Sequence, residues 1–252
     1  EIGPGVLEAA ITYSDALSSA DNAVIFKNMV KVIAHRHDLI PTFMAKWSVE
    51  HQGQSGHIHV SLRDEKGTNI FYDKNGAHTM SETMRQFVAG QMKYMPELLA
   101  LVGSTVNDYV RLMPGFWAPT EANWSLDNRT SALRVIAGSE KAQRVEYRVG
   151  SASSNPYLAL SAAILSGLMG IEEKLELGPP VTGNAYDLPS IPEFTLPHSL
   201  TEAAAKFRGS KLARSVLGDL FVDDYATTRE WEEKQYRKQI TDWQLQRYFE
   251  VI

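Results

Sequence analysis

The sequence of 252 residues contains no cysteine, which excludes disulfide scaffolds, thiolate zinc sites, iron–sulfur clusters and cysteine nucleophiles. Any metal must therefore be held by His, Asp, Glu and water. The Walker lysine loop and the GxGxxG, GxSxG and HExxH motifs are also missing, which argues against P-loop NTPases, Rossmann enzymes, serine hydrolases and zinc proteases. The longest apolar stretch, 157–171, is shorter than the roughly 20 residues that span a bilayer, so it predicts a buried helix.

The charge and composition of the chain limit the kinds of protein and partner further. The formal net charge is −5, so the molecule as a whole attracts neither nucleic acid nor an anionic membrane, and we expect neither as a partner. Hydrophobic residues make up 44% of the chain, which is enough for a sizeable core. The chain begins at Glu1 without Met, and EIGPG does not resemble a signal peptide, so the sequence indicates a segment from within a longer protein.

Hydrophobic periodicity predicts an α+β fold. Ala23, Phe26, Val30 and Ile33 recur at helical spacing and predict a helix from about 18 to 37, with Lys27 off its packed face. Strands are predicted at 42–45, 57–62, 131–136 and 144–149, with a turn at 64–67. A second helix is predicted from a capping box at 79–82 to about 101, and a third from Asn155-Pro156 to before 178. Gly167 and Gly170 predict that the third helix packs closely on a neighbour. A surface loop is predicted at 179–199, followed by charged helices.

One predicted strand carries an alternating pair of histidines. His57, His59 and Ser61 share one face, and apolar residues occupy the other. The imidazoles on this face could bind a hard divalent ion, or the face could be an ordinary exposed face of a sheet. The strand alone does not decide between the two, because one strand cannot complete a metal site.

A second strand places Arg144, Glu146 and Arg148 on one face. A carboxylate between two guanidinium groups stays ionised, and arginine can also bind phosphate or carboxylate through two hydrogen bonds. The pattern therefore favours either anion binding or a solvated ladder of ion pairs. Four more cations lie in the same part of the chain: Arg111, Arg129, Arg134 and Lys141.

Two carboxylates flank the turn-forming GPG segment near the start. Glu1 and Glu8 suit Mg²⁺ or Mn²⁺ as oxygen ligands, but two surface carboxylates explain this spacing equally well.

Taken together, these segments resemble the catalytic domain of the glutamine synthetase family. The resemblance rests on EIGPGVLE, GQSGHIHVSL, NDYVRLMPGFWAPTEANWSLDNRTSALRV and KAQRVEYRVGSASSNPYLALSAAILSGLMGI, in this order, and it covers residues 1–252. It implies an antiparallel sheet forming an open barrel-like cleft flanked by helices. The family's upstream β-grasp domain and its first metal-ligand strand are absent from the sequence, so the domain is incomplete.

The resemblance implies a metal-dependent cytoplasmic ligase that uses ATP to make γ-glutamyl phosphate from L-glutamate and then an amide with ammonia or a primary amine. It also implies a homo-oligomeric ring, a dodecamer or a decamer. The implied metal ligands are Glu1 and Glu8 for one Mg²⁺ or Mn²⁺ ion, and His57 and Glu146 for the second. The implied substrate contacts are Gly53, Arg111 and Arg134, the catalytic cations Arg129 and Arg148, and the nucleotide contacts His59, Ser61 and Lys141.

Some positions depart from the family pattern. Trp117 stands in PGFWAP where ammonia-using members carry a Glu, which favours an organic amine as the acceptor. Tyr186 resembles a tyrosine that one bacterial branch adenylylates, although a structural role is the more ordinary explanation. Two other functions remain open: a catalytically inactive structural or interaction protein of the same family, and an α+β module that binds a sugar or a nucleotide.

Overall fold

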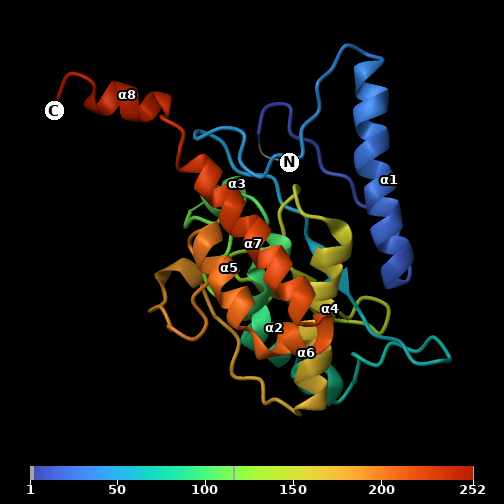
Figure 1. The fold of residues 1–252 in the computed structure, drawn as a ribbon. Coiled ribbons are helices and arrows are strands. Elements are labelled where there is room, and N and C mark those ends of the chain that lie inside the picture. Colours follow the sequence, from blue (N-terminus) through green and yellow to red (C-terminus); the bar gives the residue numbers. More distant parts are fainter. Residues whose placement is uncertain (1–2, 116, 252) are drawn as a thin grey trace.

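Four short strands form a sheet beside a bundle of helices in the computed structural model, which describes residues 3–115 and 117–251 (Figure 1). The helices are α1 (Ala16–His35), α2 (Glu82–Val102), α3 (Val106–Arg111), α4 (Pro156–Glu172), α5 (Leu200–Gly209), α6 (Lys211–Leu217), α7 (Asp219–Tyr236) and α8 (Asp242–Tyr248), with 3₁₀ turns η1 (Ala77–Thr79) and η2 (Ala185–Asp187). The strands are β1 (Ile58–Val60), β2 (Trp124–Leu126), β3 (Leu133–Ile136) and β4 (Arg144–Tyr147). The α+β class predicted from the sequence is confirmed.

The strand order is β1-β4-β3-β2. The pairs β1–β4 and β3–β4 are antiparallel, as expected, but β2 pairs with β3 in parallel, so the sheet is mixed. Strand β2 was not predicted, because its three residues are too few to show a period. The register places four polar residues in one row across the sheet: His59, Glu146, Arg134 and Ser125.

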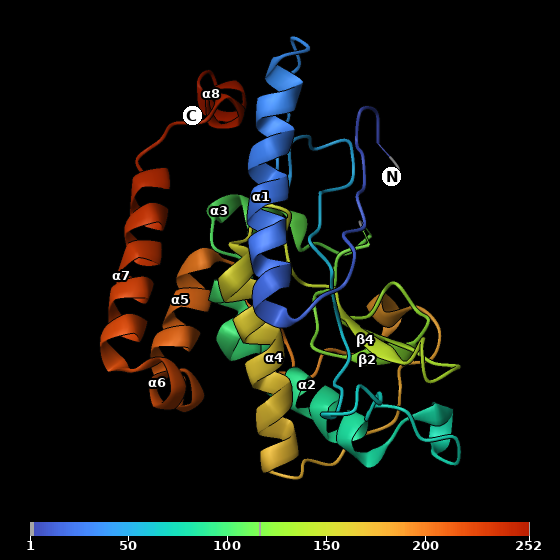
Figure 2. The same cartoon turned by 90° about the vertical axis from the view of Figure 1, so that its right-hand side faces the viewer.

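The opposite face of the sheet belongs to the hydrophobic core. Leu133, Val145 and Tyr147 are fully buried in one cluster with α2 and α4 residues such as Leu98 and Ala163. Figure 2 shows β2 and β4 to one side of these helices. The predicted alternation of apolar and polar residues in β4 is confirmed, and it turns the charged side chains away from the helices.

The contact between α2 and α4 depends on glycines, as predicted for Gly167 and Gly170. A Cβ atom at Gly170 would lie 2.6 Å from the Cα atom of Gly90, and one at Gly167 would meet the ring of Phe87. The two helix backbones therefore approach more closely than side chains would allow.

Helix starts follow the predicted caps closely. Asn155 Oδ1 accepts a hydrogen bond of 3.0 Å from the amide of Tyr157, and Pro156 begins α4. Ser81 caps α2 by accepting from the amide of Met84, so the helix begins at Glu82, the last residue of the predicted box. The predicted turn at 64–67 is present, closed by an antiparallel bridge between Arg63 and Asn69.

The strand predicted at 42–45 is wrong. This segment is a loop, held by a hydrogen bond of 2.7 Å from the amide of Gln54 to Ala45 O and by one of 2.8 Å from the amide of Lys46 to Asn107 Oδ1. Its apolar side chains match a strand, but within the described residues no neighbouring strand pairs with it.

Helix α1 packs on α4 along only part of its length (Figure 2). Ala20 is its only buried residue among those described, and Ile33, which the sequence placed on the packed face, is 54% exposed. Within the described residues no helix is both long and apolar enough to cross a membrane.

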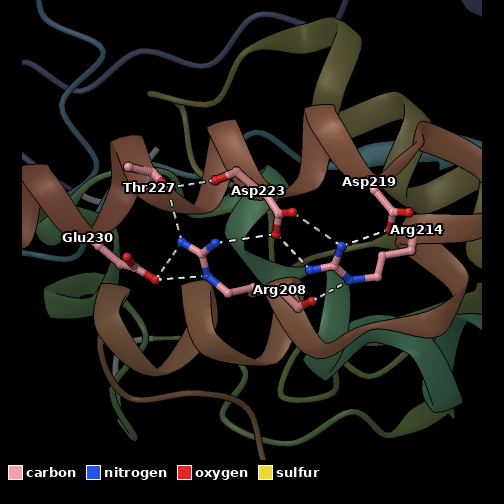
Figure 3. Close-up of polar contacts among 6 residues, drawn as sticks. All are labelled: Arg208, Arg214, Asp219, Asp223, Thr227 and Glu230. Atoms are coloured by element: carbon pink, nitrogen blue, oxygen red, sulfur yellow. Dashed lines mark hydrogen bonds and ion pairs between the residues drawn. The ribbon is translucent and has the colours of Figure 1, made fainter.

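The three helices α5, α6 and α7 are joined by an ion-pair network, which Figure 3 shows. Asp223 on α7 accepts from Arg208 of α5 at 3.3 Å and from Arg214 of α6 at 2.7 Å. The remaining members are Asp219, Thr227 and Glu230, all on α7. One carboxylate therefore holds two helices to a third.

We expect Gly170→Ala to destabilise the protein by about 1–3 kcal/mol, because the new methyl group overlaps backbone atoms that cannot rotate away. Helix propensity alone predicts the opposite sign, by about 1 kcal/mol. Gly209→Ala is the matched control, since it is also helical and a Cβ atom there meets nothing within 4 Å. Denaturant unfolding of both variants checks this, and equal effects would contradict it.

We expect Asp223→Asn to lower the melting temperature by a few degrees at pH 7. The hydrogen bond from Arg214 lowers the pKa of Asp223 from its ordinary value of 3.8, so its stabilisation is present above that value and is lost as the pH falls through the lowered pKa. Wild type and variant should therefore converge in acid. Asp224→Asn, an exposed neighbour outside the network, is the control for melting curves between pH 3 and 7; a pH-independent difference would contradict the ion-pair explanation.

Candidate functional site

Glu146 is the centre of the charged face of the sheet. Its side chain is 4% exposed, and its Oε1 atom lies 2.7 Å from Arg148 Nη1 and 3.1 Å from His57 Nδ1. Its Oε2 atom lies 3.2 Å from Arg134 Nη1. The antiparallel register brings these groups from three segments to one carboxylate, which confirms the predicted polar faces of both strands.

The surroundings of Glu146 and His57 determine the protonation states of these two side chains. Burial raises the pKa of Glu146, but the hydrogen bond with His57 and the charge of Arg148 outweigh it and lower the pKa to about 2. Burial lowers the pKa of His57 despite the nearby carboxylate. At neutral pH the site therefore offers an ionised carboxylate and a neutral imidazole, the forms in which both can bind a metal.

Arginine donors around Glu146 are not all satisfied. The Nε atoms of Arg134 and Arg148 are buried without a hydrogen-bond partner among the described residues. Arg134 also donates to Asp127 Oδ1 at 3.0 Å, from the loop between β2 and β3. Because unsatisfied buried donors are costly, both guanidinium groups are suited to a further anion, such as a carboxylate or a phosphate.

Arg111, at the end of α3, is a buried cation that makes no salt bridge in the described part of the chain. Its Nε atom donates to Ser151 Oγ at 3.2 Å and its Nη2 atom to Gly150 O at 3.1 Å and to Val149 O. Burial lowers the pKa of Arg111 to about 10. Its hydrogen-bond acceptors are all neutral, and the nearby charge of Asp108 only partly offsets the effect of burial, so an incoming carboxylate would be stabilised here.

Gly53 lies against this arginine. A Cβ atom at Gly53 would be 2.5 Å from both Arg111 Cγ and Ala45 O, so any larger residue would displace the guanidinium group or the loop. The predicted pair of Gly53 and Arg111 is therefore brought together, and glycine is required by this close approach.

His59, Ser61 and Lys141 are exposed, and only His59 contacts the central cluster. Its Nδ1 atom accepts a hydrogen bond of 3.1 Å from Arg144 Nε. Antiparallel pairing of β1 with β4 places Ser61 and the turn that carries Lys141 at one end of this strand pair, and Gly150 at the other.

Arg129 and Trp117 line a surface pocket of ≈ 690 Å³ between the β2–β3 loop and residues 180–184. Trp117 is 49% exposed, and its φ of 57° is left-handed, which is uncommon for a side chain of this size. Tyr186 donates from its hydroxyl to Ala118 O at 3.1 Å, next to Trp117. In this arrangement the Tyr186 hydroxyl supports the loop that carries Trp117.

Of the two carboxylates predicted to bind the first metal ion, the structure describes only Glu8. Glu1 lies outside the described residues, and Glu8 is exposed on a segment without regular secondary structure. Within the described ranges, no group of three or more His, Asp or Glu residues is placed to hold a metal ion. His57 and Glu146 nevertheless supply a nitrogen and an oxygen donor at one point, a combination that Mg²⁺ and Mn²⁺ accept.

Sequence reasoning missed the loop 150–154, although Arg111 of the site hydrogen-bonds to it. Ser151 accepts from Arg111, and Ser153 Oγ donates to the buried carboxylate of Asp108. The serine-rich run SASSNP was a usable signal, because serines before an N-cap often hydrogen-bond to backbone and side chains nearby.

Comparison with known proteins gives a consistent result. The model of the family described as "Glutamine synthetase, catalytic domain" matches residues 1–248. Type-1 glutamine synthetase 2 of Dictyostelium discoideum is 44% identical over 100% of this chain and 49% of its own length, and glutamate–isopropylamine ligase of a Pseudomonas species is 42% identical over 100% and 55%. The solved structure of apo GmaS has a TM-score of 0.85 at 30% identity, covering 95% of this chain and 55% of that one. The chain thus spans about half the length of the curated relatives it matches.

Proposed function

Because this chain belongs to the glutamine synthetase family, we propose that the intact protein is an ATP-dependent ligase acting on L-glutamate. In the first step the γ-carboxylate of glutamate attacks the γ-phosphorus of ATP, forming γ-glutamyl phosphate and releasing ADP. In the second step ammonia or a primary amine attacks the acyl carbon, inorganic phosphate leaves, and the nitrogen loses a proton. The products are a γ-glutamyl amide, ADP and phosphate.

The observation that carries this proposal is the cluster around Glu146. Phosphoryl transfer needs positioning and charge neutralisation more than covalent chemistry. Arg148 supplies a buried cation and Arg134 a partly buried one, each with an unsatisfied Nε donor, and His57 with Glu146 supplies metal-ligating atoms at the same point. An anion would thus be stabilised by charges that the sheet holds in place.

The positions of residues along the β1–β4 pair support the assignment of substrates. Lys141 and Ser61, proposed with His59 to bind the nucleotide, lie toward the end of the pair nearest the β3–β4 turn, and His59 pairs with Glu146 in its middle. Gly53 and Arg111, proposed with Arg134 to bind glutamate, lie near the opposite end, where Arg111 donates to Gly150 O. Glu146 lies between these groups, paired with Arg148, and Arg148 and Arg129 are proposed to stabilise the transferring phosphoryl group.

In this proposal His57 and Glu146 hold one Mg²⁺ or Mn²⁺ ion, and Glu1 and Glu8 hold another. The neutral imidazole of His57 and the ionised carboxylate of Glu146 support the assignment of these two residues as metal ligands. When bound by these residues, a divalent ion would supply positive charge for the phosphate oxygens of ATP.

Trp117 favours an organic amine over ammonia as acceptor. Its half-exposed indole lines the pocket together with apolar residues such as Leu126 and Val181, and the indole offers surface to an alkyl group but no base to accept a proton. Asp127, an acidic residue in the same lining, is already paired with Arg134. A relative named for isopropylamine is consistent with this choice.

A catalytically inactive family member is the alternative. Keeping Glu146 and Arg148 buried beside the partly buried Arg134 costs desolvation free energy, and replacing such a cluster by apolar residues is often neutral or stabilising. Arg111 adds a buried cation whose hydrogen-bond acceptors are all neutral. An inactive scaffold has no physical need for these charges, which supports catalysis.

Assembly into a homo-oligomeric ring, a dodecamer or decamer, and a location in the cytoplasm, where ATP is available, complete the proposal. Exposed aromatic and apolar side chains on α8 support self-association, since apolar surface gathered on a projecting helix favours contact with another chain (Figure 1). They are Trp243, Leu245 and Tyr248.

We expect Glu146→Ala to abolish ATP-dependent turnover and weaken Mn²⁺ binding by at least about 100-fold, because an inner ligand matters more than the outer partners whose loss costs 10–100-fold. It should also destabilise the protein by about 3–5 kcal/mol, since Arg148 loses its counter-charge. Glu146→Gln, which keeps the shape, separates the two effects.

Mn²⁺ titration followed by electron paramagnetic resonance measures the affinity directly, and Glu140→Gln, an exposed residue on the turn before β4, is the control. Unchanged Mn²⁺ affinity in Glu146→Gln, or near-full activity at low Mg²⁺, would exclude the metal assignment.

Phosphate release by the intact protein with ATP, glutamate and a panel of amines tests the function as a whole. We expect a two- or three-carbon amine to exceed ammonia by about ten-fold or more in kcat/KM, because each methylene that reaches the indole contributes up to about 0.8 kcal/mol. Trp117→Glu should shift the preference toward ammonia; it leaves a side chain at the same left-handed position, so backbone strain is similar.

Trp231→Glu, at a 63% exposed position on α7, controls for the change of residue type. Equal use of ammonia and every amine by wild type would identify ordinary glutamine synthesis. No glutamate-dependent phosphate release with any acceptor, from protein that binds ATP, would favour the inactive alternative.

A further inference from the structure

Lys27 points from α1 into the body of the protein, although its helical position places it off the apolar face. Its Nζ atom donates to three backbone carbonyls: Ala152 O at 2.9 Å, Ser153 O at 3.3 Å and Ser154 O at 3.0 Å. An ammonium group has three donors, and here each one has an acceptor in the same short loop. Lys27 therefore fixes the path of the backbone between β4 and α4.

This loop forms a ladder with a second one. Ser151 and Ser55 form an antiparallel bridge, the amide of Gly56 donates to Gly150 O at 2.9 Å, and the amide of Ala152 donates to Gln54 O at 3.2 Å. The loops 53–56 and 150–154 are therefore a single hydrogen-bonded unit, which Lys27 holds from one side.

The same unit carries the groups proposed to bind glutamate. Arg111 donates to Ser151 Oγ and to Gly150 O, and Gly53 packs directly on the Arg111 side chain. A shift of residues 152–154 would thus move the acceptors that orient the guanidinium group. A displacement of about 1 Å in a positioning contact can cost about 100-fold in rate.

We propose that Lys27 is a positioning residue, which holds the loop 150–154 so that Arg111 and Gly53 are aligned for the amino-acid substrate. This inference rests on the proposed function for the identity of the substrate, but its geometry stands apart from it. Lysine suits this role because its charged group, at the end of a flexible stem, has one donor for each of the three carbonyls.

A purely structural role, in which Lys27 only attaches α1 to α4, leads to different expectations. Loss of Lys27 would then lower stability and impair all kinetic parameters together. A positioning role affects glutamate far more than ATP, because the nucleotide candidates Ser61 and Lys141 lie at the opposite end of the strand pair, and the third candidate, His59, lies at its middle.

The kinetic test compares Lys27→Met and Lys27→Arg in the intact protein. We expect Lys27→Met to raise the KM for glutamate by about ten-fold or more while the KM for ATP stays within about two-fold, and Lys27→Arg to restore most of the loss because it keeps the charge and the donors. Lys31→Met, one turn further along α1 at an exposed position, is the control. Equal changes in both KM values, or no rescue by arginine, would overturn the positioning role.

Hydrogen exchange provides a readout that does not need activity. In Lys27→Met the amides of Gly56 and Ala152 should exchange about ten-fold or more faster than in wild type, with Lys31→Met unchanged, because the ladder between the two loops opens more often. Unchanged exchange at these amides would overturn the inference even if the enzyme is active. Faster exchange in a protein without ligase activity would support Lys27 and contradict only the proposed function.

Discussion

A buried carboxylate held by two arginines and a histidine determines how this sheet is built. Glu146 would be costly in the protein interior without Arg148 and Arg134, which approach it at 2.7 and 3.2 Å. These partners come from its own strand segment and from β3, so the ion pairs form only in one register. A slip of one residue would carry Glu146 into the layer of Val145 and Tyr147, where no counter-charge lies.

The apolar side of the sheet makes this arrangement rigid enough for chemistry. Strand β4 is backed by fully buried residues that pack on α2 and α4, and those helices touch through Gly90 and Gly170. Close packing of this kind transmits displacement instead of absorbing it. The charged side chains therefore stand on a fixed support, as the proposed stabilisation of a transferring phosphate requires.

Features with a local period could be predicted from the sequence, and features set by distant partners could not. The faces of β4 and the start of α4 at Asn155 follow from alternation and capping, which involve neighbours in sequence. Strand β2 exists because β3 pairs with it, and the segment 42–45 is a loop because no strand in the described part of the chain pairs with it. Lys27 was predicted to lie off the packed face for a related reason. Helical periodicity shows which face of a helix meets apolar residues, but a charged side chain can also point inward when backbone carbonyls accept its hydrogen bonds.

Site residues show the same division. Residue types indicated the polar strand faces that carry His57 and Glu146, whereas the meeting of these two residues depends on tertiary packing and entered only through family resemblance, as did the pairing of Gly53 with Arg111. The arrangement also separates two groups of residues in space. The charge cluster lies on the central strands, while Trp117 and Arg129 line a pocket formed by loops at the β2 edge. Under the proposed function, Trp117 can change without disturbing the strand register, so acceptor preference can vary among relatives while the cluster around Glu146 stays the same.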